Sequence, residues 1–222
     1  CEDNDYNFLS LKGGKFKVPA ERRKQFWRYY LRGLEADIDY NLVYVPDNTK
    51  THFPVTFDFD IVSRSSDEIP NDRMASLVIA AVDCLCTVTG VFDGLTVYAL
   101  RKPGHTQRND GQFKSGCHLL VHGVLLSKHA ARQVRQKFLE MEFVREFVDE
   151  FSVTEPEELI DSAVCPIGRN GLHLAPQKKK GRTTHYYCFF TCEITKRHPE
   201  NVQQFDYEEG TSYVKENVST IY

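Results

Sequence analysis

The residues of this chain best suited to chemistry are two aspartates, one residue apart, inside an apolar run. They lie in the segment Val55-Thr56-Phe57-Asp58-Phe59-Asp60-Ile61. Because side chains alternate faces along a strand, Asp58 and Asp60 project from one face and the apolar residues from the other. Neighbouring carboxylates repel each other unless a cation lies between them or solvent reaches both. Hard cations such as Mg²⁺ bind carboxylates together with substrate phosphates, so the pair predicts half of a phosphoryl-transfer metal site. The alternative is an edge strand with a solvated acidic face.

A second segment, Lys114-Ser115-Gly116-Cys117-His118-Leu119-Leu120-Val121-His122, places two histidines on one face of a predicted strand. Gly116 allows another backbone or a phosphate to come close. The ammonium of Lys114 and the imidazole N–H of His118 can both donate hydrogen bonds to triphosphate oxygens. Two interpretations of His118 stay open, a nucleotide ligand and a hydrogen-bonded sheet histidine. His122 is interpreted as structural.

Two later segments could complete such a site. Asp161, in the short apolar run Leu159–Ala163, could add a third carboxylate, although aspartate also begins turns. Downstream, Arg169-Asn170 precedes a basic hairpin connection, which carries Lys178, Lys179, Lys180 and Arg182. These cations suit nucleotide phosphates or a template backbone, and the alternative is a solvated turn.

The composition is that of a globular protein, with 222 residues, 41% hydrophobic and 27% charged residues, and a net charge of -3. Basic residues nevertheless cluster early, between Arg22 and Arg32, where a local basic groove could form. No apolar run reaches the ~20 residues of a membrane span, so no membrane partner is expected. Seven cysteines, an odd number, fit a reducing compartment such as nucleus or cytoplasm. A zinc site is not expected, although one could be assembled on paper from Cys84, Cys86, Cys165, His173, Cys188 and Cys192.

Hydrophobic periodicity predicts an α+β fold, with an antiparallel or mixed sheet covered by helices and the Asp58 strand at its centre. We expect an irregular leader over 1–19, a globular domain over 20–195 and a polar extension or linker over 196–222, the whole being a piece of a longer protein. Asn71 and Ser127 are predicted helix N-caps. The expected helices are 20–35, 71–88 and 127–151, and the expected strands are 42–46, 53–62, 95–100, 117–126, 159–163, 172–174 and 184–191.

The order of these motifs resembles that of the archaeo-eukaryotic primase superfamily. The matching order is Val55–Asp60, then Gly116-Cys117-His118, then Ile160-Asp161, then the Arg-Asn and Lys-rich hairpin. Within the superfamily, the chain is similar to eukaryotic PrimPol and to the primase domains of helicase-primases from large DNA viruses. The resemblance covers about residues 9–194, and includes a leader, Leu9–Pro19, like the start of the viral domains. One departure is Gly116, where the family usually has serine.

The resemblance implies a primase–polymerase catalytic domain over 20–195, with an RRM-like sheet, flanking helices and an N-terminal α/β module that together form a catalytic cleft. It implies nucleotidyl transfer from NTP or dNTP on a single-stranded DNA template, and a helicase domain on the same polypeptide, in the host cell of a large DNA virus. Asp58, Asp60 and Asp161 would be catalytic and would hold two Mg²⁺ or Mn²⁺ ions. The implied nucleotide-binding residues are Lys114, Ser115, Gly116, His118, Arg169 and Lys179, and the implied nucleic-acid-binding residues are Lys178, Lys180 and Arg182. The residues alone leave two alternatives, a non-catalytic nucleic-acid-binding module and a metal-dependent nuclease.

Overall fold

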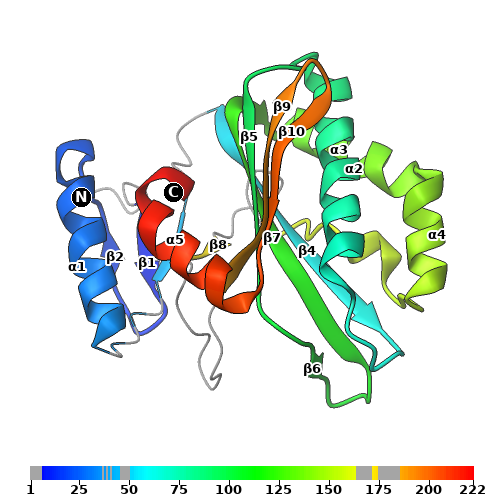
Figure 1. The fold of residues 1–222 in the computed structure, drawn as a ribbon, viewed down its shortest axis with the longest axis horizontal. Helices are drawn as coiled ribbons and strands as arrows, with labels where there is room; N and C mark the ends of the chain where they lie inside the picture. The colour runs from blue at the N-terminus through cyan, green and yellow to red at the C-terminus, as the bar shows by residue number, and fades with distance from the viewer. Residues whose placement is uncertain are drawn as a thin grey trace.

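The protein has an α+β fold, as the sequence predicts, in which helices pack against antiparallel sheets (Figure 1). The computed structural model describes residues 7–36, 38, 40, 42–45, 51–163, 172–174 and 186–222. The helices are α1 (Arg23–Glu35), α2 (Asn71–Thr89), α3 (Lys128–Glu140), α4 (Glu142–Glu150) and α5 (Tyr207–Ile221), with 3-10 turns at Ala20–Arg22 and Pro156–Glu158. The strands are β1 (Phe8–Ser10), β2 (Lys15–Phe16), β3 (Leu42–Tyr44), β4 (His52–Ser63), β5 (Leu95–Arg101), β6 (Thr106–Gln107), β7 (Phe113–Ser127), β8 (Leu172–His173), β9 (Tyr187–Thr195) and β10 (His198–Gln204).

The central sheet has the strand order β10-β9-β5-β7-β4, and every neighbouring pair in it is antiparallel. In Figure 1, helices α2, α3 and α4 lie on one side of this sheet, and α5 with the N-terminal elements lies on the other. The short strand β6 pairs with β7 beyond the body of the sheet. Within the described part of the chain, the sheet therefore has one face closed by helices α2–α4 and an opposite face approached by α5 and the N-terminal elements.

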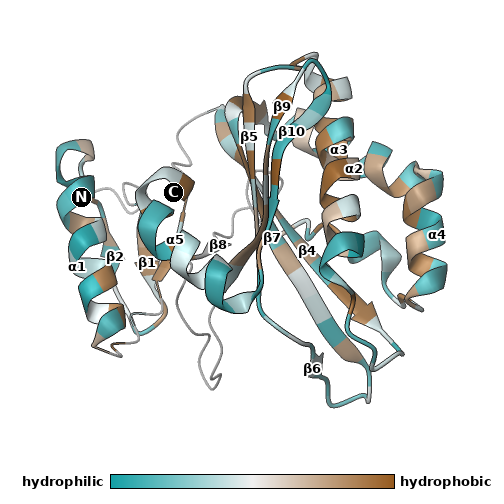
Figure 2. Ribbon diagram, in the orientation of Figure 1, coloured by the Kyte–Doolittle hydropathy of each residue, from teal (hydrophilic) through white to brown (hydrophobic). Residues whose placement is uncertain are grey.

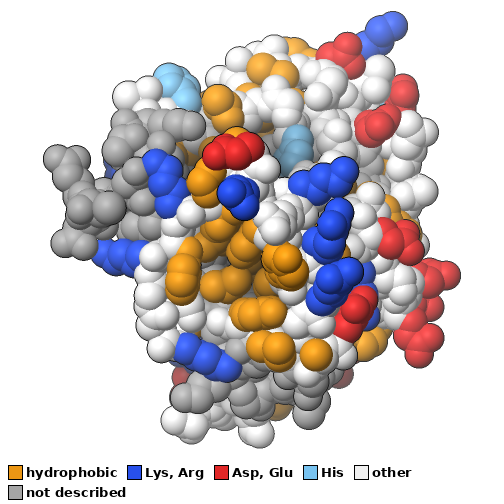
Figure 3. All heavy atoms as spheres, turned by 90° about the vertical axis from the view of Figure 1, so that its left-hand side faces the viewer, with side chains coloured by type: hydrophobic (Ala, Val, Ile, Leu, Met, Phe, Trp, Pro, Cys, Tyr) orange, Lys and Arg blue, Asp and Glu red, His pale blue; other side chains and the backbone are white. Residues whose placement is uncertain are grey.

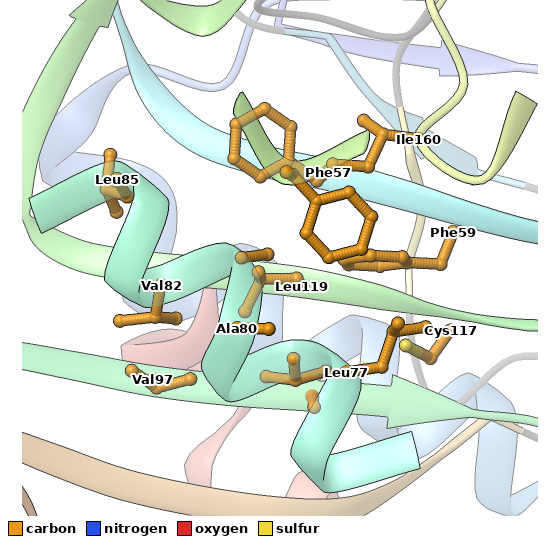
Figure 4. Packing of buried hydrophobic residues seen from close by; sticks show 14 of the residues in the cluster. Phe57, Phe59, Leu77, Ala80, Val82, Leu85, Val97, Cys117, Leu119 and Ile160 are labelled. Atoms are coloured by element: carbon orange, nitrogen blue, oxygen red, sulfur yellow. The ribbon is translucent and has the colours of Figure 1, made fainter. Parts of the chain in front are cut away.

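The main core fills the space between the sheet and helices α2–α4. On α2, Leu77, Ala81 and Leu85 recur at helical spacing and are fully buried. They pack against the apolar face of β4, where Phe57 and Phe59 are buried (Figure 4). Figure 2 shows the same division, with hydrophobic colouring on the sides of the helices that turn toward the sheet. Each fully buried Leu or Phe side chain contributes about 1.5–3 kcal/mol, so this face of β4 fixes the strand's register.

The two ends of the chain are more regular than the sequence predicts. Strands β1 and β2 lie in the predicted leader and form a second sheet, of order β2-β1-β3-β8. This sheet and α1 make the N-terminal module, whose core includes Phe8, Trp27 and Tyr30. The predicted polar extension contains β10 and α5, and Val214, Val218 and Ile221 of α5 are buried. Strands of two or three residues are too short to show alternation, and the apolar residues of α5, although at helical spacing, are few among charged and polar ones.

The helix boundaries differ from prediction at two points. The predicted helix 127–151 is two helices, because Met141 has extended backbone angles (φ -66°, ψ 139°) between α3 and α4. Ser127 caps α3 as predicted, its hydroxyl accepting a hydrogen bond from the Ala130 N–H at 3.1 Å. Asn71 is not the N-cap of α2; it is the first residue of the helix, and Pro70 precedes it. The Asn71 side chain instead accepts a hydrogen bond from Arg101 at 3.0 Å.

Strand β4 lies at the edge of the sheet, so the predicted central position was wrong. Its outer edge is covered by the segment 152–161. The Thr154 N–H donates to the Val62 carbonyl at 2.8 Å, and the Asp161 N–H donates to the Asp58 carbonyl at 2.8 Å. The predicted strand at 159–163 is not a strand, but it runs along β4 through these bonds. The cover gives hydrogen-bond partners to backbone groups that an open edge of β4 would leave unpaired.

Candidate active site

Asp58 and Asp60 project from the face of β4 that turns away from helices α2–α4. Their side chains are 23% and 26% exposed, whereas Phe59 between them is fully buried on the opposite face. The alternation predicted from the sequence therefore holds, because Val55, Phe57, Phe59 and Ile61 are all buried in the main core. The two carboxylates stand side by side where solvent or a cation can reach them.

Strand β7 carries the two basic partners of these acids. Asp58 pairs in register with His118, and the His118 Nε2 lies 3.6 Å from the Asp58 Oδ1. Lys114, nearer the start of β7, places its Nζ 2.6 Å from the Asp60 Oδ2. His118 is 4% exposed, while the Lys114 side chain is 43% exposed. Asp58 therefore faces a buried imidazole, and Asp60 is paired with an ammonium group on a half-exposed side chain.

Gly116 is directly opposite Asp60 in the register of β4 and β7. Its φ is +155°, and a Cβ at this position would lie 1.8 Å from the carbonyl oxygen of Phe59. No side chain fits in that space. The sequence suggested that glycine at this position allows close approach of either another backbone or a phosphate. The structure shows the close approach of another backbone, that of β4. The glycine lets β7 come against β4 at the point where the acids stand.

Asp161 joins the same place from the segment that covers β4. The backbone bond from its N–H to the Asp58 carbonyl brings it beside the acidic pair. Its carboxylate accepts a hydrogen bond from the Ala163 N–H at 2.7 Å, a local turn that orients the side chain. The three aspartates border one open cavity of about 380 Å³. The other predicted residues along its wall are Lys114, Ser115, Gly116 and His118.

Three further residues on this wall were missed by sequence reasoning. The Tyr186 ring lies 4.5 Å from the His118 ring, and the Lys102 Nζ lies 4.7 Å from the centre of the same tyrosine ring. Arg108 also borders the cavity and pairs with Glu155 at 3.0 Å. Burial and the nearby Asp58 raise the pKa of Tyr186, so this hydroxyl stays neutral. For Lys102 and Arg108 the signal in the sequence was a polar, basic stretch after the predicted strand 95–100, whereas Tyr186 lies in the predicted strand 184–191.

The basic hairpin falls outside the described residues. This holds for Arg169, Lys178, Lys179, Lys180 and Arg182, all of them predicted to bind phosphates or template.

Four of the cysteines considered for zinc lie apart from the cavity, and Cys165 is outside the described residues. Cys84 and Cys86 are buried on α2, and Cys188 and Cys192 are buried on β9. Burial raises the pKa of Cys84 to about 11 and those of Cys188 and Cys192 to about 12. These thiols are therefore protonated at neutral pH and pack as small apolar groups.

The donor set of the cavity is that of a site for a hard cation. Its acids offer carboxylate oxygens, which Mg²⁺ and Mn²⁺ prefer. Among the described residues, no three His, Cys, Asp or Glu side chains are already gathered in a metal-binding geometry. Asp60 instead holds the Lys114 ammonium, which occupies the position of a positive charge beside the acidic pair. The residues fit a divalent cation provided that Lys114 yields its place on Asp60.

Comparison with known proteins identifies the family. A family model described as the C962R protein N-terminal AEP domain matches residues 7–189, which include all the described residues of the cavity. AEP denotes the archaeo-eukaryotic primases, the superfamily that the order of motifs resembles. No curated protein matches the chain. Within the described part of the chain, no helix is long and apolar enough to cross a membrane. The chain therefore belongs to the C962R-type family of archaeo-eukaryotic primase domains.

Proposed function

We propose that this domain is a DNA-directed primase–polymerase that adds nucleotides from NTP or dNTP to a strand paired with a DNA template. Family membership supports a primase-like nucleotidyltransferase. The observation that carries the finer proposal is the meeting of Asp58, Asp60, Asp161, Lys114 and His118 around one cavity. Transfer of a nucleotidyl group requires ligands for divalent cations and hydrogen-bond donors for the phosphates. The three carboxylates can supply the first, and Lys114 and His118 can supply the second. The helix-backed sheet and the N-terminal module would then form the RRM-like frame of a catalytic cleft.

The acids are the proposed metal ligands. Two Mg²⁺ or Mn²⁺ ions, when bound, would supply the positive charge that activates the attacking oxygen and neutralises the triphosphate. Asp58 and Asp60 would hold them from β4, and Asp161 would hold them from the covering segment. The primer 3′-oxygen attacks the α-phosphorus, its proton is released, and pyrophosphate leaves.

The donors on β7 are the proposed triphosphate ligands. His118 is buried between Asp58 and the Tyr186 ring, so its imidazole has a fixed orientation. Lys114 is more exposed, and we expect it to move from Asp60 to the phosphates when cations bind. Ser115 and Gly116 supply backbone along the same wall. Arg169 and Lys179 keep their proposed role in neutralising the triphosphate.

Single-stranded DNA is the proposed template. Five basic residues of the N-terminal module are exposed, namely Arg22, Arg23, Lys24, Arg28 and Arg32. Figure 3 shows Lys and Arg side chains gathered beside an exposed apolar area on the face of the molecule that carries α1. Exposed Phe16 and Tyr29 belong to this module and could stack on bases. Lys178, Lys180 and Arg182 are proposed to contact the template backbone, and a helicase domain is proposed on the same polypeptide.

The test is nucleotide incorporation on a primed single-stranded DNA. Labelled ATP and dATP are each supplied with Mg²⁺, Mn²⁺ or EDTA, and the products are resolved by length. A primase–polymerase extends the strand with either metal and not with EDTA. A binding module retards the DNA equally in metal and EDTA and incorporates nothing. A nuclease shortens the strand, and either of these last two results would refute the proposal.

A further inference from the structure

We propose that Lys102, on the loop after β5, is a further nucleotide-binding residue that binds the terminal phosphates of the incoming triphosphate. The inference rests on the proposed function and extends it along the cavity wall from His118 to the loop that follows β5. It concerns a lysine just after β5, the strand that pairs with β7 on the side opposite β4.

The order of strands places Lys102 across the cavity from the acids. Asp60 on β4 is opposite Gly116 on β7, and β7 is followed by β5, which ends at Arg101. Neighbouring strands are about 4.8 Å apart, so two strand spacings, on the order of 10 Å, separate the acids from Lys102. A triphosphate whose α-phosphate lies beside the aspartates would extend its β- and γ-phosphates toward the loop after β5. On the way it would pass Gly116, which has no side chain to block it.

The loop that carries Lys102 is anchored by hydrogen bonds on both sides of this residue. Arg101, just before it, is fully buried and donates to the Ile69 carbonyl at 2.9 Å and to the Asn71 Oδ1 at 3.0 Å. Just after it, the Gly104 N–H donates to the Glu68 Oε1 at 2.9 Å, and the same oxygen lies 3.5 Å from Arg101 Nη2. Lys102 is therefore held between two fixed points. A preorganised cation binds phosphate with less loss of side-chain entropy.

The Tyr186 ring connects Lys102 to the proposed triphosphate site. Both the Lys102 ammonium and the His118 imidazole contact this ring, so the two donors border the same part of the cavity. Arg108 borders the cavity too, but its guanidinium is paired with Glu155 and Asp110. That pairing assigns Arg108 to holding the loop.

The test is the affinity of the 222-residue chain for dATP, dADP and dAMP with Mg²⁺, measured by titration calorimetry without DNA. Lys102→Met keeps the apolar stem against Tyr186 and removes the charge; Lys102→Gln is a second neutral variant, and Lys102→Arg keeps the charge. Lys128→Met is the matched control, because Lys128 also lies over an aromatic ring, that of Phe53, but is not on the cavity wall. Thermal unfolding is recorded for every variant.

We expect the neutral variants to bind dATP about tenfold or more weakly, dADP less affected and dAMP within twofold of the parent, because charge-assisted hydrogen bonds to the tail are lost. Lys102→Arg and Lys128→Met should bind like the parent. Parent-like dATP affinity in both neutral variants would overturn the inference, and so would an equal loss for all three nucleotides. If the parent itself binds no nucleotide, the proposed function fails as well. A parent that binds and incorporates dATP while Lys102→Met matches it refutes the role of Lys102 alone.

Discussion

Replacing Gly116 with alanine tests the strand pairing on which the site is built. The new Cβ would lie 1.8 Å from the Phe59 carbonyl oxygen, a backbone atom that no side-chain rotation can move away. Overpacking of this kind costs about 1–3 kcal/mol. The φ of +155° adds about 1–3 kcal/mol for a residue with a Cβ. We therefore expect Gly116→Ala to lower the free energy of unfolding by about 2–6 kcal/mol.

The control is Gly90→Ala at the C-terminal end of α2. Gly90 has a φ of +72°, and a Cβ there would meet nothing within 4 Å. It should cost only the backbone strain, about 1–2 kcal/mol. The measurement is urea unfolding followed by circular dichroism, with the midpoint and slope fitted for each variant. If Gly116→Ala is as stable as Gly90→Ala, β7 does not approach β4 as described, and the pairing of Asp60 with Gly116 is wrong.

Three further predictions concern the frame of the site. Arg101→Met should lower the free energy of unfolding by about 2–4 kcal/mol in the same urea assay, because the Ile69 carbonyl and Asn71 lose a charged donor; a change under 0.5 kcal/mol would contradict its anchoring role. Ser127→Ala should cost about 1 kcal/mol by removing the α3 cap, and an unchanged urea midpoint would show that the cap is not formed. Burial raises the pKa of Cys84 to about 11 and of Cys192 to about 12, from 9.0, so the unfolded chain releases these protons first as pH rises. The free energy of unfolding should therefore fall between about pH 9 and 11. Replacing both cysteines with alanine should make that fall less steep in urea midpoints measured across this range. An equally steep fall in the double variant would exclude these thiols as its cause.

The acidic strand could be predicted from the sequence because its signal is local. Phe57, Phe59 and their apolar neighbours alternate with Asp58 and Asp60, and a strand with one buried face has no other register available. His118 was placed on the correct face of β7 for the same reason. The family could be inferred from the order of these short motifs, since their spacing follows the order of elements in the fold.

Other features depend on contacts between distant segments. The edge position of β4 could not be read from its composition, because the cover supplied by residues 152–161 buries it as a neighbouring strand would. Asp161 was predicted as a third acid. What brings it to the site is a backbone hydrogen bond to Asp58, and no sequence pattern predicts that bond. Lys102 lies on a polar loop, and only the sheet order shows that it borders the cavity. The break at Met141 lies inside a continuous apolar stripe, where periodicity predicts one helix.

We propose that Asp58 and Asp60 carry out the chemistry while the core holds the fold. The most direct measurement is primer extension by the Asp58→Ala, Asp60→Ala double variant beside the parent, with Mg²⁺ or Mn²⁺ and with thermal unfolding recorded for both. Asp58 and Asp60 are partly exposed, so the double variant should stay folded. The account predicts a folded protein that incorporates no nucleotide. Near-normal extension by the folded double variant would contradict it.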